Sequence, residues 1–315
     1  MTVINAHKNF IYKVLKYLIL ISAYTYVFYK IISFNNYTEL IKHLKEMSIN
    51  NFIYLLFVFL LLPINWLIEA YKWKKIVSKS QNLSVKTAYK SVLAGCSTGF
   101  FTPNRIGDMV GRLMFLDPAN RKMGMSYFLV NSLSQNIAII LVGLPATILF
   151  FSLVSNLFSV GFSYYFAGII LLFLVLSILL FILPRLAVSK KLNRLSTYIQ
   201  AFVYFKKLDF IKILAFSLFR FTIFCVQFYF MLLFWGVNLS VWQALLVIPT
   251  NYLFITFTPS LAFSEPAIRS SYGVLFIGAF LNQAPAIAFA GFALWLINYA
   301  FPMLFGAVFL VKKQQ

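Results

Sequence analysis

Two short polar stretches of the same pattern interrupt a chain that is otherwise strongly apolar. Each contains a Thr-Pro pair, an acidic residue five or six positions after the proline, and an arginine four positions after the acid. The residues are Thr102, Pro103, Asp108 and Arg112 in the first stretch, and Thr258, Pro259, Glu265 and Arg269 in the second. An acid and an arginine at this spacing share a helix face and can form an ion pair. Because an ionised side chain at bilayer depth costs about 2.5–3.5 kcal/mol, four of them at matched positions predict a dedicated site.

The Thr-Pro pairs indicate how such a site could handle an anion. Proline ends the preceding helix, and a threonine just before it can cap the helix that follows. A half-helix that starts after the break presents N–H groups and a positive dipole end to a group such as phosphate. Two interpretations remain open. Either each acid–arginine pair neutralises itself and holds its segment in place, or the arginines bind an anionic lipid headgroup while the acids position it or couple transport to ions.

Two charged residues outside these stretches also lie in apolar runs. Arg220 stands alone within its run, where it could contact a headgroup or serve as a paired or snorkelling structural residue. Glu69 lies near Lys72 and Lys74 at the basic end of an earlier run. This position favours an interfacial salt bridge over an ion-coupling site.

The elements that carry these residues are those of an all-α polytopic membrane protein. The 315 residues are 62% hydrophobic and 11% charged, with a mean hydropathy of +0.86. Apolar runs long enough to span a bilayer, about 20 residues each, recur throughout. The net charge of +20 comes from basic residues between these runs, which indicates loops facing an anionic leaflet rather than a nucleic-acid partner. Neither the two cysteines, Cys96 and Cys225, nor the two histidines have ligand-like neighbours, so no metal or cofactor is expected.

Segment lengths predict about six transmembrane helices and two re-entrant helical hairpins in a single membrane domain, residues 1–315. A short apolar piece of about 13 residues reaches only ~20 Å, which is less than a ~30 Å hydrocarbon core. A hairpin that enters and leaves on one face therefore fits better than short or tilted full spans, which remain the alternative. The expected spans are 10–34, 52–71, 125–153, 161–183, 213–235 and 284–311, and the hairpins pair 84–101 with 104–116 and 241–257 with 265–280.

The basic residues predict the orientation of this arrangement. Of the 27 lysines and arginines, four fall on the outer half and one within a span, so 22 remain on the inner side, together with both termini. Residues 184–212 are rich in basic residues and partly amphipathic, so this segment is expected on the inner surface.

An odd number of spans, three, separates the two hairpins, so they are expected to enter from opposite faces as parts of an inverted repeat. The Thr-Pro motifs would then converge near the middle of the membrane. The predicted segments are 10–51 (first span and outer link), 52–153 (first repeat, hairpin 84–116), 161–212 (connecting span and basic inner loop) and 213–311 (second repeat, hairpin 241–280).

The segment TPNRIGDMVGR, together with TPSLAFSEPAIR in the second half, resembles the flippase-like membrane domain of lysylphosphatidylglycerol synthases and their stand-alone relatives. The resemblance covers about residues 10–311, and the chain departs from the pattern at Asn104, where glycine is usual, and at Asp108, where glutamate is usual. The resemblance implies a polytopic inner-membrane protein, and in the synthases the related domain is credited with moving the lipid product between leaflets. The matching residues are Thr102, Pro103, Arg105, Gly107, Asp108 and Arg112, and more loosely Pro259, Glu265 and Arg269.

Three functions follow as hypotheses. The first and preferred one is a flippase or transporter that moves an anionic lipid or lipid-linked amphiphile between leaflets, with membrane lipids as partners and no cofactor. The second is an integral-membrane transferase for a lipid-linked substrate with Asp108 or Glu265 as base, although no nucleotide or metal motif supports it. The third is a non-catalytic membrane partner of a separate lipid-modifying synthase, with the basic segment 184–212 as the docking surface. The candidate substrate-binding residues are Thr102, Pro103, Arg105, Asp108, Arg112, Arg220, Thr258, Pro259, Glu265 and Arg269.

Overall fold

The computed structural model describes residues 49–100, 102–154, 205–260 and 264–314, together with Thr38, Ile41 and Lys45, and no strand occurs among them. Its α-helices are α3 (Ile49–Val77), α4 (Val85–Phe100), α5 (Gly107–Leu113), α6 (Arg121–Leu153), α9 (Lys207–Phe234), α10 (Val241–Phe257), α11 (Glu265–Ile277), α12 (Ala284–Trp295) and α13 (Phe301–Gln314). Short 3-10 turns, η1 (Pro103–Arg105) and η2 (Pro118–Asn120), precede α5 and α6, and a π-helical segment, η4 (Leu296–Ala300), joins α12 to α13. The predicted spans at 10–34 and 161–183, the outer loop at 155–160 and most of the basic segment 184–212 lie outside the described residues.

Four helical segments are long and apolar enough to cross a membrane: Asn51–Val77, Pro118–Leu153, Lys207–Phe234 and Ala284–Val311. Large apolar side chains remain exposed along them, for example Leu60 of α3, Ile148 of α6 and Phe305 of α13. Exposed apolar surface of this extent is typical of helices that face lipid rather than water. The prediction of an all-helical membrane protein is therefore confirmed for the described residues.

Most helix bounds lie within a few residues of the predicted ones, and two differ more. α10 has the predicted bounds, and α6 continues through Pro145, as a transmembrane helix tolerates. α3 extends beyond the predicted end at residue 71, because Lys72 and Trp73 are buried instead of interfacial. Residues 207–212, predicted as part of the basic surface segment, form the first turns of α9.

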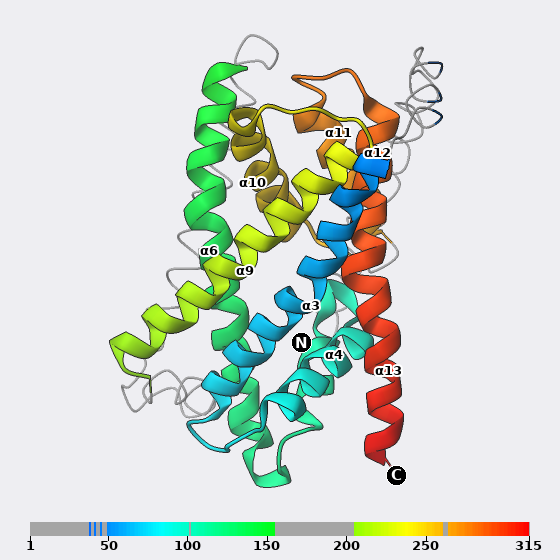
Figure 1. Cartoon of the computed structure of the whole chain (residues 1–315). Helices are drawn as coiled ribbons and strands as arrows, with labels where there is room; N and C mark the ends of the chain where they lie inside the picture. The colour runs from blue at the N-terminus through cyan, green and yellow to red at the C-terminus, as the bar shows by residue number, and fades with distance from the viewer. Residues whose placement is uncertain are drawn as a thin grey trace, which may run out of the picture.

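The two halves of the chain are interleaved (Figure 1). α3 and α9 lie side by side in the centre and run in opposite directions. α4 packs against α5 and against α13 of the second half, while α10 packs against α11 and against α6 of the first half. The α4–α5 pair lies toward the lower end of the view in Figure 1 and the α10–α11 pair toward the upper end.

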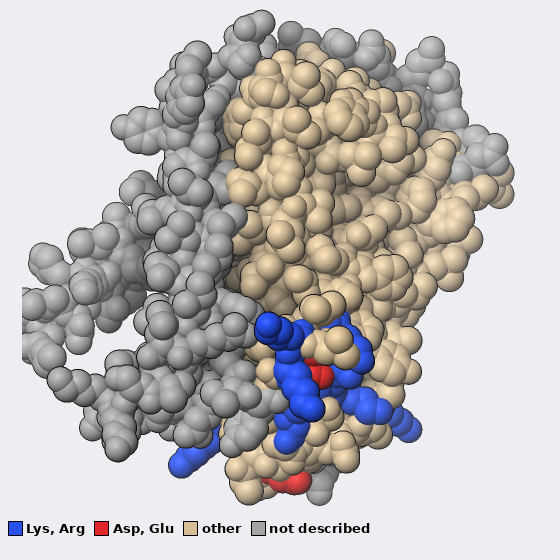
Figure 2. Space-filling model, turned by 90° about the vertical axis from the view of Figure 1, so that its left-hand side faces the viewer, with Lys and Arg blue, Asp and Glu red and all other residues tan. Residues whose placement is uncertain are grey.

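Basic residues gather at the lower end of the molecule. The C-terminal ends of α3 and α13 and the N-terminal ends of α6 and α9 all lie there (Figure 1). On the face shown in Figure 2, lysine and arginine occupy the lower part, and the described surface above them contains none in this view. The residues at these helix ends are Lys74, Lys75, Arg121, Lys122, Lys206, Lys207, Lys312 and Lys313.

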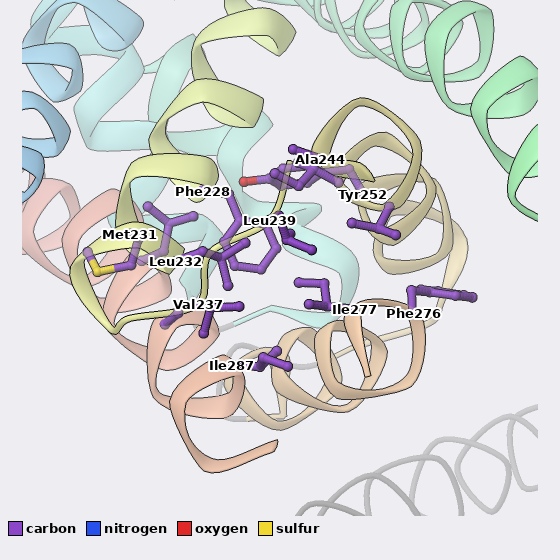
Figure 3. Packing of buried hydrophobic residues seen from close by; sticks show 14 of the residues in the cluster. Phe228, Met231, Leu232, Val237, Leu239, Ala244, Tyr252, Phe276, Ile277 and Ile287 are labelled. Carbon is purple, nitrogen blue, oxygen red and sulfur yellow. The ribbon is translucent and has the colours of Figure 1, made fainter. Parts of the chain in front are cut away.

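A continuous apolar core holds the second half together. Figure 3 shows Phe228 and Leu232 of α9 packed toward Tyr252 of α10, Ile277 of α11 and Ile287 of α12. Leu232, Ile277 and Ile287 are completely buried. Since lipid tails are as apolar as these side chains, such packing stabilises the bundle through close contact rather than through removal from water.

Close packing within the α4–α5 hairpin depends on glycine. Gly95 and Gly99 of α4 face Asp108 of α5, and a Cβ atom at either position would press against that residue. A Cβ atom on Gly111 of α5 would overlap the Thr98 hydroxyl and the Ala94 carbonyl of α4. Small residues spaced four apart on both helices let the backbones approach this closely.

We expect Gly111→Ala to destabilise the protein by about 1–3 kcal/mol, because the added methyl group overpacks a backbone contact that cannot move without separating the hairpin. The apparent Tm of the purified protein in detergent is the measurement. Gly273→Ala is the matched control, since its Cβ would meet a side-chain atom, Cγ2 of Ile287, at 3.2 Å. Equal losses for the two variants would contradict this account.

Candidate functional site

The two Thr-Pro turns, far apart in the sequence, touch each other. The backbone N–H of Asn104 donates to the carbonyl of Ser260 at 3.0 Å, and the backbone N–H of Ser260 donates to Oδ1 of Asn104 at 2.8 Å. Asn104 and Arg105 adopt left-handed backbone conformations, with φ of 48° and 56°. Asparagine tolerates this region better than other residues except glycine, and here its side chain also supplies the second contact.

The two motif threonines act differently. Oγ1 of Thr102 accepts a hydrogen bond from the Gly107 amide at 2.7 Å and donates to the Gly99 carbonyl, so it joins the start of α5 to the end of α4. The N-cap residue of α5 is Ile106, which makes no side-chain cap bond, so Thr102 is not the cap residue that the sequence suggested; its hydroxyl nevertheless occupies the first amide of α5. Thr258 ends α10 and bonds back to the Phe254 carbonyl and to the hydroxyl of Tyr272. Pro103 begins η1, and Pro259 lines the groove described below.

Arg105 and Glu265 form the strongest contact between the two motifs. Nε and NH2 of Arg105 donate to the two carboxylate oxygens of Glu265, each at 2.7 Å. The predicted pairing of Glu265 with Arg269 is only a loose contact of 3.9 Å. The helical spacing rule did not find the closer partner, because the turn at Arg105 brings a guanidinium directly onto the carboxylate, with both oxygens engaged.

Arg112 and Asp108 form the predicted pair within α5. Nε and NH2 of Arg112 lie 2.8 and 3.0 Å from the two oxygens of Asp108. The remaining nitrogen, NH1, donates to Oε1 of Glu69 on α3 at 2.8 Å. The pair therefore does not merely neutralise itself, because a second carboxylate completes it.

Glu69 is the centre of the buried charges, with a side-chain exposure of 1%. Besides Arg112, it contacts Nζ of Lys72 at 3.0 Å and NH1 of Arg220 at 3.1 Å, and it accepts a hydrogen bond from Asn131 at 2.8 Å. The expected pairing with Lys72 is present. The expected interfacial position of Glu69 is wrong, since the carboxylate lies in the interior and links α3, α5, α6 and α9.

Arg220 is a member of this cluster. Its Nε donates to Oδ1 of Asn65 at 2.8 Å, and its guanidinium lies 5.2 Å from the ring of Trp66 and 5.1 Å from that of Phe224. Where the two motifs meet, the guanidinium of Arg105 stacks 3.6 Å above the Tyr299 ring, and that of Arg269 lies 4.8 Å from it. Cation–π contacts with aromatic rings therefore help to stabilise these arginines in addition to the carboxylates.

The cluster lines a partly open cavity of about 220 Å³, to whose walls both halves of the chain contribute. Its walls include four of the predicted arginines and the two acids of the first half. These residues are Arg105, Arg112, Arg220, Arg269, Glu69 and Asp108. A wider groove of about 780 Å³ adjoins it, and both spaces are lined by Arg105, Asp108, Arg269 and Tyr299. The structure thus brings the charged members of the predicted site together, and the groove adds Thr258, Pro259 and Glu265.

Two hydrogen-bond donors on the cavity wall are unused within the described part of the chain. Nε of Arg269 and Nε1 of Trp66 are buried and have no acceptor there. A buried donor without an acceptor costs about 1–3 kcal/mol. Among the described residues, no group of three or more His, Cys, Asp or Glu is arranged to hold a metal ion.

Several residues of the cluster were absent from the predicted site: Asn65, Glu69, Lys72, Asn131 and Gln135. A signal for them exists in the sequence. Asn65, Glu69 and Lys72 follow helical spacing along one face of an apolar run, and Asn131 and Gln135 are four apart in another. Polar residues that recur at this spacing inside a membrane span indicate an interior face, and not the membrane surface.

We expect Glu69→Gln to destabilise the protein by about 3–5 kcal/mol, because it leaves buried cations without their shared carboxylate. Unfolding in mixed micelles with increasing sodium dodecyl sulfate measures the free energy. Asp209→Asn is the control, since it removes a carboxylate that pairs with Lys79 at 2.7 Å near the surface, where such pairs contribute about 0–1 kcal/mol. A loss for Glu69→Gln no larger than that for Asp209→Asn would contradict the role given to Glu69.

Comparison with known proteins supports the resemblance seen in the motifs. A family model described as lysylphosphatidylglycerol synthase TM region matches residues 14–306. No curated protein and no solved structure matches the chain. The match covers more than half of the chain and includes both Thr-Pro turns and every residue of the charged cluster. The chain therefore belongs to the family of lysylphosphatidylglycerol synthase transmembrane regions.

Proposed function

We propose that the protein moves an anionic lipid, or a lipid-linked amphiphile with an anionic group, between the two membrane leaflets. The observation that carries this proposal is the cavity lined by arginines from both halves of the chain. Counting Lys72 and Glu265 with the cavity residues gives five cations and three carboxylates, an excess of two positive charges. An anion entering this space therefore gains Coulomb energy in a poorly screened interior.

Arg269 is the docking cation of this proposal. Arg105 and Arg112 each hold a carboxylate through two hydrogen bonds, and Arg220 contacts Glu69. Arg269, by contrast, lies 3.9 Å from its carboxylate, donates NH2 to the Tyr299 hydroxyl at 3.1 Å, and keeps Nε unused within the described residues. A phosphate oxygen could pair with the Arg269 guanidinium without displacing a carboxylate at hydrogen-bond distance.

The adjoining groove supports a lipid rather than a small soluble anion. One side of the shared wall is charged, and the other is lined by large apolar side chains of α5, α6, α10 and α11. These are Ile106, Met109, Phe128, Leu129, Ile255, Phe257 and Ile268. An amphiphile would place its headgroup in the polar cavity and an acyl chain along this groove.

The proposed architecture has six spans and two re-entrant hairpins in an inverted repeat, within the single membrane domain 1–315. The contacts support it, because α4 packs on α13 in the way that α10 packs on α6, with α3 and α9 as the central pair. Because lysines and arginines gather at one end of the molecule, we place that end and both termini on the cytoplasmic side of the inner membrane. Rocking of one repeat against the other would expose the cavity to each leaflet in turn.

The alternatives receive less support. A transferase would need Asp108 or Glu265 as base, yet arginines engage both oxygens of each carboxylate. A non-catalytic partner of a separate lipid synthase would use the basic segment 184–212, most of which lies outside the described residues. Transport therefore remains the function that the geometry favours.

Reconstitution of the purified chain into liposomes tests the proposal. Headgroup-labelled phosphatidylglycerol in the outer leaflet can be quenched from outside, so protection and loss of signal report movement between leaflets. We expect Arg269→Ala to slow this movement by about tenfold or more, the effect of losing one charged hydrogen bond. Arg269→Lys should retain part of the rate, and Lys86→Ala, which removes an exposed lysine of α4, should not change it. No movement of any anionic lipid by the unaltered protein would overturn the proposal.

A cross-link between the two turns tests the rocking motion separately. The contact between Asn104 and Ser260 suits a disulfide in an Asn104→Cys, Ser260→Cys variant with Cys96 and Cys225 replaced by serine. If the repeats separate during transport, oxidation should stop lipid movement and reduction should restore it. The single-cysteine variants are the controls, and full transport by the oxidised double variant would show that the turns stay together throughout.

A further inference from the structure

Lys72 carries the most deeply buried cation of the cluster. Its side chain is 0% exposed, and Nζ lies 3.0 Å from Oε2 of Glu69, 3.3 Å from Oγ of Ser217 and 3.5 Å from Oε1 of Gln135. Glu69 and Gln135 line the cavity, while Lys72 lies directly behind them. The ammonium therefore influences the charge of the cavity wall without touching its contents.

The groups facing Lys72 leave its charge only partly balanced. On its own helix, Glu69 is its carboxylate, but Arg112 of α5 and Arg220 of α9 share that same carboxylate. Asp108 of α5 is engaged by Arg112. From the other elements, α6 presents the neutral amide of Gln135 and α9 the hydroxyl of Ser217, while the Asn131 amide of α6 donates to the same Glu69 carboxylate.

Lysine differs from its cationic neighbours in one chemical respect. An arginine guanidinium stays protonated in proteins, whereas a lysine ammonium can release a proton to become a neutral amine. With the ammonium protonated, the described cluster has two excess positive charges, and with the neutral amine it has one. A phosphodiester brings one negative charge, so its arrival favours the protonated form of Lys72.

We propose that Lys72 is the proton-coupling group of the protein, which binds one proton when an anionic headgroup enters the cavity and releases it when the headgroup leaves. The inference rests on the proposed function and adds the coupling ion to it. The only bond that changes is an N–H bond at Nζ, formed with a proton from solvent and later returned to solvent. Reciprocity requires that protonation of Lys72 strengthen anion binding by the same factor that anion binding strengthens protonation.

Binding of short-chain phosphatidylglycerol to the full chain in neutral detergent tests this assignment. Isothermal titration from about pH 6 to about pH 10, in two buffers of different ionisation enthalpy at each pH, reports both affinity and proton uptake. For the unaltered protein we expect proton uptake on binding and an affinity that falls as pH rises, by at most about tenfold per pH unit. The phosphodiester keeps a constant charge over this range, so the ligand itself adds no pH dependence.

Two substitutions should give two flat profiles. Lys72→Arg keeps a permanent charge, so it should bind the lipid without proton uptake and, at every pH, with the affinity that the unaltered protein has at low pH. Lys72→Met has no charge here, so it should also bind without proton uptake, but with the affinity that the unaltered protein has at high pH. Lys74→Met, on the same helix, should behave as the unaltered protein does. Apparent Tm values establish that each variant is folded. If the larger arginine prevents Lys72→Arg from folding, the pH profile of Lys72→Met alone decides whether Lys72 carries the pH dependence of binding.

The failures of the two proposals are distinguishable. If the unaltered protein binds the lipid without proton uptake, or if the pH dependence persists in Lys72→Met, the coupling role of Lys72 is wrong and the transport proposal stands. Tyr252 and Tyr299 also line the cavity and remain in every variant, so a dependence carried by them would be revealed in this way. If no anionic lipid binds at any pH, the proposed function itself is overturned.

Discussion

One buried carboxylate holds the interior of this protein together. Glu69 contacts three cations from three different helices, and each of these cations would be costly to bury alone. The position of α5 relative to α3 and α9 therefore depends on electrostatics as well as on packing. The glycines of the α4–α5 hairpin serve the same arrangement, because only a close backbone approach carries Arg112 to Glu69.

The second constraint is the contact between the halves. Arg105 belongs to the first motif and Glu265 to the second, so neither motif completes its charge balance by itself. This division leaves Arg269 without a carboxylate of its own at hydrogen-bond distance, while the two turns remain joined through Asn104 and Ser260. The contact between Arg105 and Glu265 therefore joins the two halves and leaves the Arg269 guanidinium at the cavity wall without a closely paired carboxylate.

Sequence reasoning predicted the helical class and the bounds of α10, because apolar runs and proline breaks are local signals. It found the Arg269 partner of Glu265 but missed the closer one, Arg105, since the spacing of four within a helix says nothing about an arginine on a distant turn. It placed Glu69 at the membrane interface because basic residues follow it, although α3 continues to Val77 with Lys72 and Trp73 buried. Local patterns thus identify which residues are charged within the membrane, and tertiary structure decides their partners.

The left-handed turn at Asn104 also limits how this protein can vary. Glycine would adopt the backbone conformation at lower cost but would lack the amide oxygen that accepts from Ser260. Most other residues would neither fit the turn nor make the contact. Asparagine at position 104 therefore adopts a backbone conformation that costs it more than it would cost glycine, and it supplies a hydrogen bond that joins the two halves. A single substitution there could tune how long the halves stay together while leaving the charged interior unaltered.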